Sequence, residues 1–207
     1  ILASDNGNLL PLMIKIGRIQ IFIIGLIVLG FIGLGQQFVY LWVGSEFANT
    51  YWCAILLILP SFFHLPQEIA ATGIVAANKV KQQAWVYMCM GVLNIILAFP
   101  LAACWGELGV AFSICIAYFV RTIGMNVLYV KELGIDIKLF FQRSFLKIVP
   151  ILIIMAILVF EICHQIDIPG WIGLITKGLF FVLVYALTSW FFIFNQEEKS
   201  LFKSLFP

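Results

Sequence analysis

Apolar residues are gathered into six long stretches, separated by short connections that hold most of the polar residues. A helix needs about 20 predominantly apolar residues to cross the roughly 30 Å hydrocarbon core of a bilayer. The pattern therefore predicts an all-α integral membrane protein with six transmembrane helices. Their expected ranges are approximately 19–43, 51–77, 84–105, 107–130, 145–163 and 170–194.

Composition agrees with this class, because 63% of the 207 residues are hydrophobic and only 11% are charged. Soluble domains carry about 25% charged residues. The net charge of +2 gives no reason to expect a nucleic-acid partner. Apolar and basic residues alternate between the fourth and fifth stretches, which predicts an amphipathic helix on the membrane surface. The expected parts are an approach segment at 1–18, four helices within 19–130, the amphipathic linker at 131–147, two helices within 145–194 and a tail at 195–207.

Basic residues are distributed unevenly between the two sides of the predicted bundle. Ten of the twelve Lys and Arg residues flank the spans on one side, whereas the connections at 44–50, 106 and 164–169 contain none. The positive-inside rule then places both termini in the cytoplasm. Aromatic residues at the opposite ends of the spans fit a membrane interface; they are Trp42, Tyr51, Trp52, Trp105 and Trp171.

The second apolar stretch carries an unusual polar stripe. Ser61, His64, Glu68 and Thr72 are spaced by three, four and four residues, so a helix presents all four on one face. Lipid cannot solvate such a stripe, which must face protein or a water-filled cavity. Pro60 and Pro66 remove backbone donors in the same segment and disturb its helical turns.

Arg121 is the most informative charge. It lies ten residues from Lys131, which corresponds to a depth of about 15 Å in a straight helix. Glu68 is also ten residues from the cytoplasmic end of its span. The two opposite charges share a predicted depth, which leaves two interpretations open: a structural ion pair, or a site where Arg121 contacts an anionic substrate group. In the second case Glu68 is also a candidate proton or cation site, with His64 as its relay partner.

Asn94 in the third stretch has two open interpretations, a hydrogen bond between helices or a place in a cavity lining. The five cysteines form no C-x-x-C pair and predict packing thiols, not metal ligands. No nucleotide-binding or hydrolase motif is present, so neither a cofactor nor an enzymatic reaction is expected. The chain begins at Ile1 without a signal-peptide pattern and is expected to be part of a longer protein.

Four segments carry a family resemblance: Leu41-Trp-Val-Gly-Ser-Glu-Phe-Ala at the end of the first span, Ala76-Ala-Asn-Lys-Val-Lys after the proline-broken helix, the Asn94…Pro100 helix, and the hairpin Trp105-Gly-Glu-Leu-Gly-Val-Ala. Together they resemble the carboxyl-terminal half of the O-antigen (Wzx-type) flippases of the multidrug/oligosaccharidyl-lipid/polysaccharide exporter superfamily. The resemblance covers roughly residues 15–195.

The resemblance implies about twelve helices in two six-helix lobes around a central cavity, of which this chain supplies one. It further implies a multi-pass protein of the bacterial inner membrane. Its substrate would be an undecaprenyl-diphosphate-linked oligosaccharide, moved from the cytoplasmic to the periplasmic leaflet without breaking a bond. The partners would be the amino-terminal lobe, the lipid bilayer and other polysaccharide assembly proteins. A cation-coupled multidrug exporter of the same superfamily is the main alternative; a membrane enzyme of glycan assembly and a purely structural subunit are others.

Overall fold

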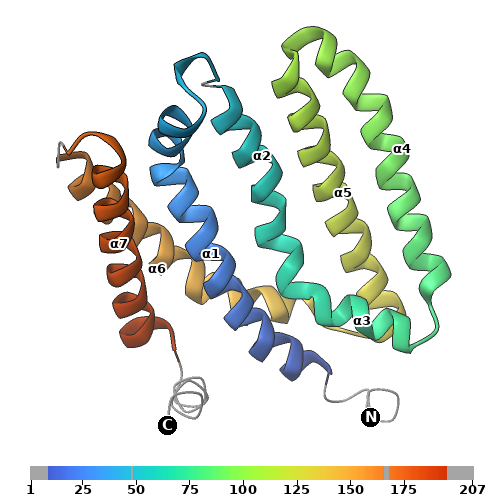
Figure 1. Ribbon diagram of the computed structural model, residues 1–207. Coiled ribbons are helices and arrows are strands. Elements are labelled where there is room, and N and C mark those ends of the chain that lie inside the picture. Colours follow the sequence, from blue (N-terminus) through green and yellow to red (C-terminus); the bar gives the residue numbers. More distant parts are fainter. Residues whose placement is uncertain (1–8, 48, 166–167, 195–207) are drawn as a thin grey trace.

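The computed structural model describes residues 9–47, 49–165 and 168–194, and every regular element in these ranges is helical. Figure 1 shows the helices side by side, with the α4–α5 hairpin at one edge and α7 at the other. The seven α-helices are α1 (Leu9–Trp42), α2 (Asn49–His64), α3 (Glu68–Ala76), α4 (Val80–Trp105), α5 (Glu107–Leu133), α6 (Ile137–Gln165) and α7 (Gly170–Thr188). Shorter turns are the 3₁₀ turns at Ser45–Phe47 and Leu65–Gln67 and a π-helical turn at Ser189–Ile193.

Six of these helical segments are long and apolar enough to cross a membrane, counting Asn49–Ala76 as one segment, and this confirms the predicted six spans. The spans extend beyond the predicted ranges, since α1 already begins at Leu9 and α5 continues to Leu133. The outer parts of the expected approach segment and tail, residues 1–8 and 195–207, lie outside the described residues.

The second span is divided by its prolines. Pro60 lies inside α2 without ending it, whereas Pro66 lies in the 3₁₀ turn that separates α2 from α3. Pro66 has no N–H to donate to the Phe62 carbonyl four residues back. At the next residue the Gln67 side chain donates to the Phe63 carbonyl at 3.0 Å. In Figure 1, α3 turns away from the direction of α2 and runs across the end of the bundle.

Tight packing is concentrated around α1, α6 and α7. A Cβ atom at Gly25 would lie 2.8 Å from Tyr185 Oη, and one at Gly33 would overlap the Phe160 ring. These glycines therefore let α7 and α6 approach α1 closely. Tyr185 is fully buried there and donates to the Phe22 carbonyl at 2.6 Å.

The region between the fourth and fifth spans is helical, and its helix continues without a break into the fifth span. Only three residues separate α5 from α6, and α6 is continuous from Ile137 to Gln165 with Pro150 inside it. Asp136 sets its start, because a carboxylate oxygen accepts the Leu139 N–H at 2.9 Å, as an N-cap residue does. Phe140 and Phe145 are buried among protein side chains and do not face lipid. Figure 1 shows the first part of α6 running across the same end of the bundle as α3.

The two ends of the bundle differ in side chains. The connections α3–α4 and α5–α6, with Lys79 and Lys138 in or beside them, lie at the end where α1 begins (Figure 1). Trp42 and Trp171 lie at the other end with ring centroids 6.3 Å apart, and both are exposed. Tyr51 differs from the predicted interface aromatics, because it is buried and donates to the Ile32 carbonyl at 2.6 Å.

Candidate functional site

Arg121 lies in the middle of α5 and is only 7% exposed. Its Nη2 donates to the Tyr87 hydroxyl on α4 at 2.6 Å, and its guanidinium carbon lies 4.6 Å from the centre of the Tyr87 ring. The Tyr118 ring is 5.8 Å away. Cation–π attraction to both rings stabilises the charge in this position. The Nε atom is buried and has no hydrogen-bond partner.

The predicted ion pair between Arg121 and Glu68 is not formed. Within the described part of the chain, the ion pair observed is Lys79–Glu132 at 3.0 Å, and Glu68 is exposed. The matched depth assumed one straight helix from Glu68 to its cytoplasmic end. The turn at Leu65–Gln67 removes that assumption, because α3 no longer continues along α2. Arg121 is therefore a buried cation whose direct partners are neutral phenol groups.

His64 is the member of the predicted stripe most closely associated with Arg121. It is half-buried, its ring centre lies 5.9 Å from that of Tyr118, and its Nδ1 is 3.2 Å from the Pro60 carbonyl. It also lies close enough to Arg121 and Glu68 to interact with their charges. We name these five residues the Arg121 cluster: Arg121, Tyr87, Tyr118, His64 and Glu68.

The other stripe residues are not brought into hydrogen bonds with Arg121. Thr72 is exposed, and its hydroxyl donates to the carbonyl of Glu68 one turn back at 3.0 Å. This local bond is the usual arrangement for a threonine in a helix. Ser61 is half-buried in α2. Their proposed roles as cavity residues remain predictions.

Of the two interpretations of Asn94, the structure shows the hydrogen bond between helices. The Ser113 hydroxyl of α5 donates to Asn94 Oδ1 at 2.9 Å. Asn94 and Tyr87 lie two turns apart on α4, and their partners lie about two turns apart on α5, as the register of an antiparallel pair requires. The sequence places Tyr87 on the same face as Asn94, and this shared face was the signal that could have identified Tyr87 as the partner of Arg121.

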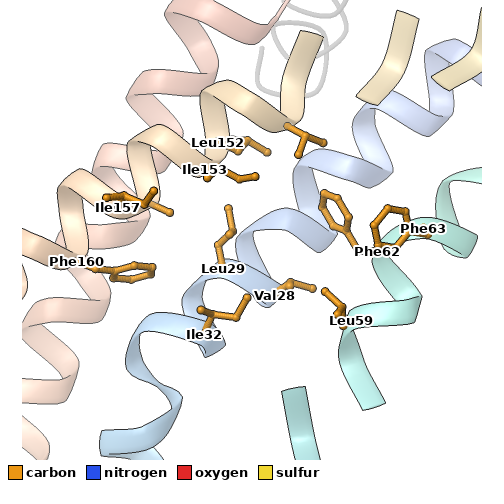
Figure 2. Close-up of a pocket in the computed structure, with 12 residues that line it drawn as sticks. Val28, Leu29, Ile32, Leu59, Phe62, Phe63, Leu152, Ile153, Ile157 and Phe160 are labelled. Carbon is orange, nitrogen blue, oxygen red and sulfur yellow. The ribbon is translucent and has the colours of Figure 1, made fainter. Parts of the chain in front are cut away.

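An apolar groove lies on the other side of α2, between α1, α2 and α6 (Figure 2). One part has a volume of about 370 Å³ and a second part about 390 Å³, and Phe62, Phe63 and Val149 line both. The Phe63 ring stacks at 6.0 Å on Phe145 in this groove and contacts Phe119 of α5 at 5.5 Å. Phe63 therefore lies between the apolar groove and α5, the helix that carries Arg121.

The guanidinium of Arg121 is suited to binding an anion. Guanidinium groups offer five donors in a fixed plane and match phosphate or carboxylate oxygens. Among the described residues, no three His, Cys, Asp or Glu side chains come together in a way that would hold a metal ion.

Comparison of the chain with protein-family models, with curated proteins and with solved structures gives no match. The resemblance to flippases therefore stays a prediction.

Proposed function

We propose that this chain is one six-helix lobe of a transporter that flips lipid-linked oligosaccharides from the cytoplasmic to the periplasmic leaflet of the bacterial inner membrane. The observation that supports the proposal most is the buried Arg121, which has no carboxylate partner among the described residues. In this account Arg121 binds the anionic part of the substrate, its diphosphate. A second lobe closes the cavity around the headgroup.

The argument from Arg121 is energetic. An arginine at the centre of a membrane helix costs about 2.5–3.5 kcal/mol on insertion scales. The hydroxyl and ring of Tyr87 reduce this cost but do not neutralise the charge. A purely structural role is better served by a neutral residue or by a true ion pair. An uncompensated cation with a spare donor at Nε is suited to an anion that arrives and leaves.

A cation-coupled exporter of the same superfamily is the second candidate. It is favoured by the exposed carboxylate of Glu68 and by the position of His64 within reach of its charge. Such a pair suits a proton that is taken up on one side of the membrane and released on the other. In this alternative the essential residues are Glu68 and His64, and Arg121 tunes their charge.

Flipping assays in vesicles test the proposal. The full-length protein is reconstituted with a fluorescent undecaprenyl-diphosphate-linked oligosaccharide, and the fraction that changes leaflet is measured by quenching. Loss of a charge-assisted hydrogen bond costs about 1.5–3 kcal/mol, so Arg121→Ala is expected to slow flipping about tenfold or more. Arg121→Lys keeps the charge without the planar fork and should be intermediate.

Ile123→Ala is the matched control, because Ile123 lies on the same helix and is 64% exposed. It should flip substrate at the wild-type rate. Equal rates for Arg121→Ala and wild type, at equal amounts of folded protein, would remove the substrate-binding role. If Glu68→Gln instead abolished proton-driven efflux of a cationic dye in the same vesicles, the exporter would replace the flippase.

A further inference from the structure

We propose that the apolar groove holds one acyl chain of an anionic phospholipid from the leaflet at the basic end of the bundle, with the headgroup at Lys138 and Gln142. This inference goes beyond the proposed function, and it rests on the lining of the groove, its length and the charges at its mouth.

The side chains that line the groove are suited to binding an acyl chain. The part of about 370 Å³ is formed by aliphatic and aromatic side chains of three helices, among them Leu29, Leu59 and Ile157 (Figure 2). Among the described residues that line the groove, Gln142 is the one polar residue, and it lies in the part nearest the start of α6. Ile153 and Ile157 of the lining are 44% and 61% exposed, so the groove reaches the surface of the bundle and a lipid can enter it from the membrane.

The length fits a chain from one leaflet. The part of the groove shown in Figure 2 follows α6 from Val149 to Phe160, a rise of eleven residues or about 16 Å at 1.5 Å per residue. Half of a roughly 30 Å hydrocarbon core is about 15 Å. Before Val149, the first part of α6 runs across the end of the bundle, where the headgroup region of a bilayer would lie (Figure 1).

The mouth of the groove is basic. Lys138 precedes Gln142 by four residues and therefore shares its face of α6. It is exposed and forms no ion pair with any residue in the described ranges. Arg143 and Lys147 are also exposed on this part of α6, and Asp136, the carboxylate just before α6, caps the helix. Basic residues beside a membrane attract anionic headgroups.

Photo-crosslinking tests the occupant. The full-length protein is placed in vesicles that contain phosphatidylcholine and phosphatidylglycerol, one of them carrying a diazirine in its acyl chain, and labelled peptides are mapped. Phosphatidylglycerol should label the groove about fivefold more than phosphatidylcholine, the effect expected from one lysine near the surface. Lys138→Glu should remove this preference. Lys81→Glu, an exposed lysine at the same end of the bundle, should not.

A second pair of variants tests whether the acyl chain of the lipid lies in the groove. Ile157→Trp fills the groove and should reduce its labelling, whereas Ile96→Trp on α4 should not; both isoleucines are 61% exposed. Equal labelling by the two phospholipids would overturn the proposal and leave only the surrounding bilayer. Displacement of the label by a small amount of undecaprenyl phosphate would also overturn it, and would assign the groove to the polyprenyl chain of a substrate.

Discussion

The two sides of α2 differ in how closely the neighbouring helices pack and in whether a charge is left without an ionic partner. On the side of the apolar groove, α1, α6 and α7 pack closely around residues such as Ile21, Leu152 and Tyr185. On the side of the Arg121 cluster, α4 has no buried residue and packs mainly against α5. The first side fixes the shape of the bundle. The second side keeps a buried charge whose partners are only neutral groups, which is the feature expected of a binding surface.

The largest effect on stability is expected at the close packing of α1. A Cβ atom at Gly17 would lie 2.9 Å from the Pro66 carbonyl and 3.0 Å from the Phe140 ring. Gly17→Leu should therefore destabilise the protein by about 1–3 kcal/mol, the usual cost of overpacking. Gly91→Leu on α4 is the control, because a Cβ atom there meets nothing within 4 Å. Thermal unfolding of the two purified variants measures the difference; similar losses would mean that α4 is packed as tightly as α1.

A smaller effect is expected at the hydroxyl of Tyr87. Tyr87→Phe removes the 2.6 Å hydrogen bond to Arg121 but keeps the ring beneath the guanidinium. Hydrogen bonds between membrane helices contribute about 0.6 kcal/mol on average. We expect a loss of stability of about that size and a flipping rate well above that of Arg121→Ala. If both variants lost transport equally, the hydroxyl itself, and not the charge, would be the essential group.

The smallest effect is expected at the Lys79–Glu132 ion pair, because the Lys79 side chain is 42% exposed. Exposed pairs contribute about 0.2–1 kcal/mol and weaken as salt screens them. A double-mutant cycle with Lys79→Ala and Glu132→Ala, measured at low and high salt, gives the coupling energy. A coupling above this range that does not change with salt would show that the pair is shielded from water.

The six spans could be predicted because each contains enough apolar residues to cross a bilayer on its own. The continuity of α6 could not, because the apolar side chains before Pro150 fit a membrane surface as well as a protein core. Their burial against α2 is decided by tertiary contacts such as that of Phe145 with Phe62. Basic and apolar residues in alternation therefore predict the helix but not whether its apolar face packs against lipid or against protein.

The sequence singles out Arg121, the central residue of the candidate site, but not the residues that it contacts. Arg121 is informative because any arginine at that depth needs an explanation. The pairing with Glu68 failed because the depth of a residue beyond Pro66 depends on the bend between α2 and α3, which the sequence indicates without giving its size. The sequence places Tyr87 on the same face of α4 as Asn94. Which residue of α5 contacts Tyr87 depends on the register of α4 against α5, which only the structure shows.

The central claim is that the side of α2 that faces Arg121 is accessible to water and has a positive potential, whereas water does not enter the apolar groove on its other side. In full-length protein whose native cysteines have been replaced, single cysteines are placed at His64, near Arg121, and at Phe62, in the groove. Each is treated with negatively and positively charged methanethiosulfonate reagents of similar size. We expect His64→Cys to react faster with the negative reagent. This preference should be lost when Arg121→Ala is added. Phe62→Cys should react with neither reagent. Equal rates at His64→Cys for the two reagents, or reaction of both reagents at Phe62→Cys, would contradict the account.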